Sequence, residues 1–158
     1  MIRLTDDKRK VAGIALGGIW IGNSADERAA MFVAKGAGIG GILNVAQDLD
    51  GTCGWGDGFE EMHVGLIDGP GNELAAYVAA VLALHALLKR HNVLVCCYGM
   101  DRSLAVAIMY MDLCDSTKRG WDNWLELLRE RVDGELPKVN AVHEQAFYAI
   151  NWDFLKRA

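Results

Sequence analysis

Five residues separate a cysteine from an arginine in a segment that could hold a phosphate group. Cys96 is followed at this spacing by Arg102, and Ser103 comes next. The segment lies between the apolar runs 92–95 and 104–111, which predict a buried strand and a buried helix. A loop between such elements directs backbone N–H groups and the positive end of the helix at an anion, and an arginine adds two parallel hydrogen bonds to phosphate oxygens. In that field a cysteine ionises below its usual pKa of about 8.5 and becomes a nucleophile.

This segment resembles the signature of the dual-specificity group of cysteine-dependent phosphatases, in the protein tyrosine phosphatase-like family. The family signature is His-Cys-x-x-Gly-x-x-Arg-Ser/Thr. Aligned on it, Cys96 takes the place of the nucleophile, Gly99 that of the glycine and Ser103 that of the hydroxyl residue. Val95 stands where the family has a histidine that supports the thiolate. The resemblance covers most of the chain, with further similar segments at 20–26, 41–46 and 140–149.

The resemblance implies hydrolysis of phosphate monoesters through a phosphocysteine. Cys96 attacks phosphorus in this scheme, Arg102 and the loop amides hold the phosphate oxygens, and Ser103 bonds the sulfur and helps it to leave. The expected substrate-binding residues are those of the loop itself, namely Cys97, Tyr98, Gly99, Met100, Asp101 and Arg102. The scheme requires no metal ion and no cofactor.

Asp68 is the candidate proton donor for the leaving oxygen. It follows the apolar run 62–67 in a segment with glycines and a proline, before a long helical pattern. The dual-specificity phosphatases carry their general acid at this place, and such acid–base help contributes about 10²–10⁴-fold.

Asp101, directly before Arg102, is a weaker second candidate for the acid. The same sequence ending is similar to loops of phosphoinositide phosphatases, in which the aspartate contacts substrate hydroxyls or assists proton transfer. The other interpretation is structural, with the carboxylate bonding loop amides or the arginine.

Strand and helix patterns alternate along the chain. Strands are expected at 11–15, 19–22, 42–45, 62–67 and 93–95, and helices at 25–35, 73–90, 104–117, 121–132 and 140–155. The glycine-rich segment 50–58 is expected to be a loop. Buried apolar strands that alternate with helices predict an α/β fold with a central, mostly parallel sheet flanked by helices. The resemblance implies a protein tyrosine phosphatase-like fold of the dual-specificity type.

The composition favours one globular domain. The 158 residues are 52% hydrophobic, and residues 1–158 are expected to form a single dual-specificity phosphatase-like catalytic domain. No apolar run reaches the 18 residues of a membrane span, and the charged first ten residues do not resemble a signal peptide. Four cysteines without CxxC spacing indicate reduced thiols. We therefore expect a cytoplasmic monomer, and the net charge of −5 counts against nucleic-acid binding.

The expected substrate is a phosphoprotein or phosphopeptide that carries phosphotyrosine, phosphoserine or phosphothreonine. An alternative within the same fold is a phosphatase for phosphoinositides or for RNA 5′ ends. A third hypothesis is a catalytically weak phosphate-binding protein, which Val95 and Asp101 keep open.

Several other residues have plain structural interpretations. Cys97 is expected to pack or to act as a redox partner of Cys96, and Cys53 could be a resolving thiol. Trp55 could line the rim of the pocket. His85, His91 and His143 show no spacing that suggests a metal site, and Trp121 and Trp124 belong to an expected core stripe.

Overall fold

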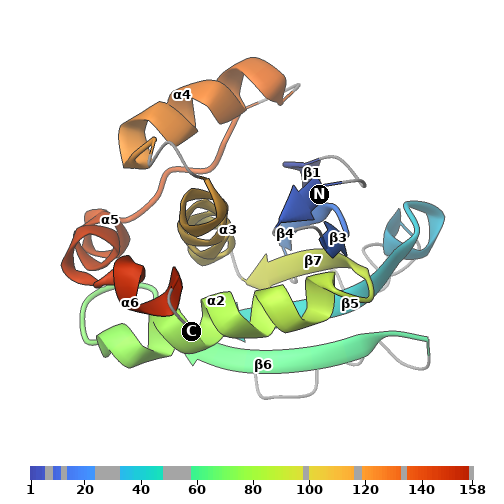
Figure 1. Cartoon of the computed structure of the whole chain (residues 1–158), viewed down its shortest axis with the longest axis horizontal. Coiled ribbons are helices and arrows are strands. Elements are labelled where there is room, and N and C mark those ends of the chain that lie inside the picture. The colour runs from blue at the N-terminus through green and yellow to red at the C-terminus, as the bar shows by residue number, and fades with distance from the viewer. Residues whose placement is uncertain are drawn as a thin grey trace.

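The computed structural model describes residues 1–5, 9–11, 14–23, 33–47, 58–97, 100–115, 119–132 and 135–156. Five described strands form one sheet in the order β1 (Ile2–Arg3), β4 (Ile19–Asn23), β7 (Asn92–Cys97), β5 (Ile39–Ala46) and β6 (Glu60–Leu66) (Figure 1). Strands β4, β7, β5 and β6 are parallel, and β1 pairs antiparallel with β4. A separate antiparallel pair consists of β2 (Arg9–Val11) and β3 (Ile14–Leu16). The predicted α/β fold with a mostly parallel central sheet is confirmed.

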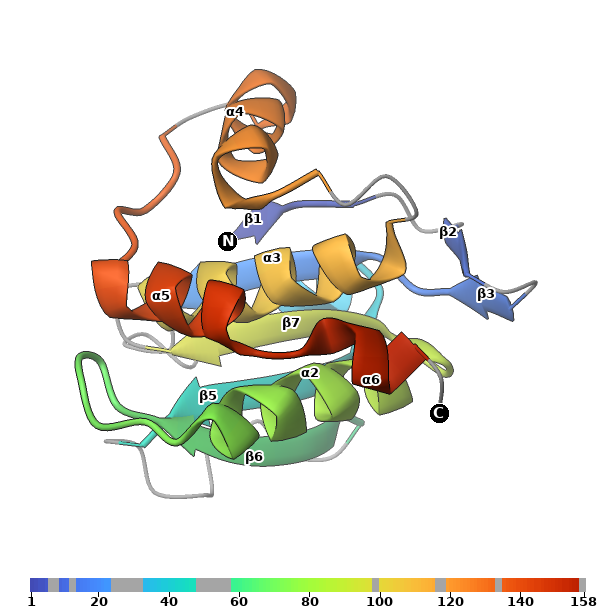
Figure 2. The ribbon, with the colours of Figure 1, turned by 60° about the vertical axis from the view of Figure 1, so that its left-hand side comes forward.

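Helices cover one face of this sheet in two layers. α2 (Leu74–Leu88) contacts β5, β6 and β7, and α3 (Asp101–Cys114) contacts β4, β5 and β7. α5 (Ala141–Ala149) contacts both α2 and α3 and runs beside them in Figure 2. α4 (Trp121–Arg131) packs on α3, and the short helix α6 (Trp152–Lys156) follows α5. Two of these helices, α3 and α5, can therefore carry side chains to the same end of the sheet.

The two faces of the central strand β7 belong to different apolar clusters. Val93 and Val95 pack toward α2 and α3 in the main core, whereas Leu94 and Cys96 pack on the opposite face. This alternation follows from the two-residue period of a strand. Because parallel strands buried on both faces need apolar side chains throughout, the run 93–95 contains only valine and leucine.

Among the described helices, α3 is the most enclosed. Its residues 101–111 are all buried, between the sheet on one side and α2, α4 and α5 on the others. The helix begins at Asp101, three residues before the apolar run that predicted it. Its N-terminus consequently lies close to the carboxyl end of β7, which ends at Cys97.

Besides the earlier start of α3, the structure differs from the predicted elements near both ends of the chain. Two short strands, β2 and β3, replace the single strand predicted at 11–15. The closing helix predicted at 140–155 is broken into α5 and α6, because Ile150 has an extended backbone (φ −80°, ψ 133°). Most of the helix predicted at 25–35 and nearly all of the loop predicted at 50–58 lie outside the described residues. Among the described helices, none has the length and apolar character needed to cross a membrane.

Candidate active site

The two ends of the expected phosphate loop lie at the carboxyl end of the central strand. Cys96 sits in β7 between Gly22 of β4 and Asn44 of β5, and α3 begins at Asp101. Tyr98 and Gly99, expected in the middle of the loop, lie outside the described residues. The first amides of α3 have no partner within the helix and carry its partial positive charge. The predicted strand before the loop and the predicted helix after it are therefore both present.

Met100, which caps α3, has a backbone conformation that favours glycine. Its φ is +67°, in the left-handed region, and it is the only non-glycine residue with positive φ in the described part of the chain. Such a conformation costs about 1–2 kcal/mol for an L-residue. Strained backbone of this kind concentrates at ligand-binding and catalytic loops.

Cys96 and Val95 face opposite sides of the sheet. The Cys96 side chain is buried against an apolar cluster that contains Trp20 and Ile42. Val95 is buried in the main core, where its apolar side chain packs without an unpaired polar group. The backbone of Cys97 ends β7.

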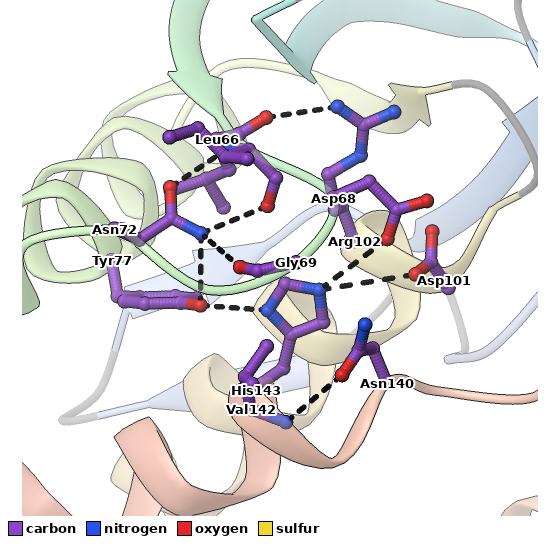
Figure 3. A network of polar contacts seen from close by, with 11 residues as sticks. Leu66, Asp68, Gly69, Asn72, Tyr77, Asp101, Arg102, Asn140, Val142 and His143 are labelled. Atoms are coloured by element: carbon purple, nitrogen blue, oxygen red, sulfur yellow. Dashed lines mark hydrogen bonds and ion pairs between the residues drawn. The ribbon is translucent and has the colours of Figure 1, made fainter.

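Arg102 joins the start of α3 to the end of β6. Its side chain is only 1% exposed, and its Nη1 donates a hydrogen bond of 2.8 Å to the carbonyl of Leu66. Asp68 lies two residues beyond that carbonyl. The arginine expected to bind phosphate and the segment expected to supply the proton are therefore held together (Figure 3). Ser103 is buried in the first turn of α3 beside it.

Two carboxylates and a buried imidazole meet at this point. His143 Nε2 lies 3.9 Å from Asp68 Oδ1 and 3.8 Å from Asp101 Oδ2. The three residues come from the β6–α2 connection, the N-terminus of α3 and α5, and Figure 3 shows them pointing toward one another. Asp68 is half exposed, Asp101 is 13% exposed and His143 is fully buried. The cluster thus extends from solvent into the core.

Burial sets the protonation of this cluster. Burial, together with a hydrogen bond to Asp68, raises the pKa of Asp101 to about 6. Burial lowers the pKa of His143 below its usual value, against the opposing charge of Asp68. The imidazole is therefore mostly uncharged near neutral pH, and Asp101 keeps its proton up to about pH 6.

A hydrogen-bond chain behind His143 determines which ring nitrogen carries its proton. The orientation of the Asn72 amide is fixed, since its Oδ1 accepts from Ile67 N (2.7 Å) and its Nδ2 donates to Ile67 O (2.8 Å). The same Nδ2 donates to the Tyr77 hydroxyl at 3.2 Å. That hydroxyl is 2.7 Å from His143 Nδ1 and, having accepted from Asn72, donates its own proton there (Figure 3). We therefore assign the hydrogen of the neutral ring to Nε2, the atom that faces the carboxylates.

The same three side chains form a donor set that divalent cations use. Their ligand atoms all lie within 4.8 Å of one another. Metal ligation through His143 would require Nε2 without its hydrogen. Because the Asn72–Tyr77 chain places a hydrogen on Nε2, the arrangement fits a hydrogen-bonded pair of carboxyl groups better than a cation site.

The structure brings together three of the residues singled out from the sequence, namely Arg102, Asp101 and Asp68. Cys96 lies in β7 before the loop, and Ser103 lies in the first turn of α3 after it. Sequence reasoning missed His143, which it considered only as a metal ligand. A usable signal was present, because His143 shares one face of its helix with Ala146 and Phe147, at spacings of three and four residues. A histidine on such a face is buried and needs a polar partner.

Comparison with known proteins supports the fold. No protein-family model matches the chain, and no curated protein matches it. Among solved structures, it is similar to a Shewanella putrefaciens CN-32 protein described as "Putative phosphatase (DUF442)", with a TM-score of 0.53 and 18% identity. The similarity covers 71% of this chain and 84% of the other. The likeness places the chain in the same α/β fold as that protein.

Proposed function

We propose that this protein hydrolyses phosphate monoesters through a covalent phosphocysteine on Cys96, as the dual-specificity phosphatases do. One observation carries the proposal. The segment from Cys96 to Arg102 connects the central strand to the N-terminus of a buried helix, and the carboxyl groups of Asp68 and Asp101 lie beside it. The phosphatase description of the structural neighbour adds independent support.

In the first step the Cys96 thiolate attacks phosphorus. The S–P bond forms as the P–O bond to the leaving group breaks, and the leaving oxygen takes a proton from the carboxyl pair. Arg102 and the first amides of α3 stabilise the charge on the remaining phosphoryl oxygens. In the second step water attacks the phosphocysteine and gives a proton back to the carboxylate, and the S–P bond breaks to release phosphate and the thiolate. Ser103 supports the departing sulfur.

The two aspartates divide the acid's role between them. Asp68 is half exposed and stands on a segment that can face a substrate, so it delivers the proton. Asp101 is largely buried, and its raised pKa of about 6 keeps a proton available to the pair close to neutral pH. Asp68 therefore remains the proposed general acid, and Asp101 serves as its partner.

The favoured substrates are phosphotyrosine, phosphoserine and phosphothreonine in proteins or peptides. The alternative of a phosphoinositide substrate depends on an Asp101 that contacts inositol hydroxyls. In this structure the Asp101 carboxylate faces Asp68 and His143, which gives that alternative less support. The net charge of −5 counts against RNA 5′ ends.

Turnover of para-nitrophenyl phosphate tests the proposal. The wild type should hydrolyse this substrate, Cys96→Ser should reduce the rate to background, and the matched control Cys97→Ser should retain most of it. A panel of phosphopeptides and inositol phospholipids, read by released phosphate, then separates the two substrate classes. A wild type that binds inorganic phosphate but turns over none of these substrates would show a phosphate-binding protein and overturn the proposal.

A further inference from the structure

His143 stands apart from the residues used so far, because no step of the proposed reaction needs it. It is fully buried, and the described residues offer its Nε2 no acceptor within hydrogen-bonding distance. The nearest polar atoms are the carboxylate oxygens of Asp68 and Asp101, both slightly below 4 Å. A buried N–H without an acceptor reduces the stability of the folded state, so such groups are uncommon in proteins.

The groups around His143 define what it can do. Asp68 faces it from the β6–α2 connection, Asp101 from the start of α3 and Tyr77 from α2. Arg102 adds a positive charge near the ring, which opposes protonation of the imidazole. A neutral ring with its hydrogen on Nε2 can donate to one carboxylate at a time and can move between the two with small displacements.

We propose that His143 is a positioning residue for the general acid: a small displacement brings its Nε2–H into hydrogen-bonding distance of Asp68 or of Asp101, while the Asn72–Tyr77 chain fixes the ring. This inference rests on the proposed phosphatase function, which it deepens. It explains why a half-exposed aspartate on a glycine-rich segment can keep a defined place beside Arg102. It also assigns a role to Asn72, which bonds Ile67 and Gly69 within the acid-bearing segment and reaches Tyr77 in α2.

A comparison of substrates with poor and good leaving groups distinguishes positioning of the general acid from changes in folding or phosphate binding. A general acid accelerates departure of a poor leaving group such as an alkyl or phenyl oxygen, whereas a nitrophenolate leaves without help. Removal of the His143 N–H should therefore lower kcat for phenyl phosphate by about 100-fold and leave kcat for para-nitrophenyl phosphate within a few-fold. A change in folding or in phosphate binding would affect both substrates alike.

Two substitutions at His143 provide the test. His143→Leu keeps an apolar side chain of similar size and removes the N–H, so it should show the full leaving-group effect. His143→Gln retains an N–H at nearly the same reach and should recover most of the phenyl phosphate turnover. Equal loss on both substrates in His143→Leu, or no recovery in His143→Gln with both variants folded, would overturn the inference.

Nitrogen NMR of the His143 ring, in the wild type and in Tyr77→Phe, tests the inference without relying on the His143 variants or on enzyme activity. Nitrogen NMR of the wild type should place the His143 hydrogen on Nε2, and Tyr77→Phe, which removes the donor to Nδ1, should weaken that preference. A hydrogen on Nδ1 in the wild type contradicts the inference whatever the activity. Absence of turnover on both substrates in a wild type with the Nε2 hydrogen would instead count against the phosphatase proposal.

Discussion

Replacement of Asp101 by asparagine should stabilise the protein at neutral and alkaline pH. The folded state holds this carboxyl group buried, which raises its pKa from the usual 3.8 to about 6. An asparagine keeps the shape of the protonated acid, can donate to Asp68 and accept from His143, and never has to ionise. The Asp101→Asn variant therefore avoids a cost that the wild type meets whenever the group loses its proton.

The size and sign of the effect follow from linkage. Because the pKa is raised in the folded state, the free energy of unfolding of the wild type falls as the pH rises from about 4 to about 6. Above that range this contribution is constant. A shift of roughly two units corresponds to about 3 kcal/mol at pH 8, and only about 1 kcal/mol of it is present at pH 4.5. The difference in free energy of unfolding between Asp101→Asn and the wild type should consequently increase by about 2 kcal/mol from pH 4.5 to pH 8.

Urea denaturation at pH 4.5, 6 and 8 measures this difference. The matched control is Glu130→Gln, which changes an exposed carboxylate on α4 and should alter stability by no more than about 0.5 kcal/mol at each pH. A difference between Asp101→Asn and wild type that does not vary with pH, or that declines as pH rises, would refute the description of Asp101 as a buried acid paired with Asp68.

Two further predictions concern the scaffold and the phosphate site. A Cβ atom at Gly17 would clash with the backbone oxygen of His91, so Gly17→Ala should destabilise the fold by at least about 2 kcal/mol in urea denaturation. Gly36→Ala, with no atom near the new methyl group, should not destabilise it. Arg102→Lys replaces the planar guanidinium by a single ammonium charge and removes the hydrogen bond to the carbonyl of Leu66. Inhibition by inorganic phosphate should therefore weaken by about ten- to hundredfold. Unchanged inhibition would contradict the phosphate-binding role of Arg102.

The order of strands and helices could be predicted from the sequence because the spacing of apolar residues indicates which side chains of a strand or helix are buried. The runs 42–45 and 93–95 are buried strands, and the long apolar pattern at 73–90 is α2. The start of α3 was predicted too late, since Asp101, Arg102 and Ser103 are polar and yet buried in its first turn. The usual link between polarity and exposure fails at this candidate site.

The candidate site could be predicted from the sequence only in part. Cys96 and Arg102 were proposed from their spacing, and Asp68 from its place after a strand. His143 lies 42 residues after Asp101 in the sequence, and only the packing of α5 against α2 and α3 brings it to the carboxylates. The hydrogen-bond polarity from Asn72 through Tyr77 likewise depends on side-chain orientation, which no sequence pattern records.

The most direct test of the account is to trap the covalent intermediate. A reaction of the wild type with a phosphate monoester, quenched in acid within milliseconds and digested, should yield a peptide with one phosphoryl group on the sulfur of Cys96. The same adduct should form in Cys97→Ser, and none should form in Cys96→Ser. Turnover without a phosphorylated cysteine, or with the phosphoryl group on Cys97, would contradict the account.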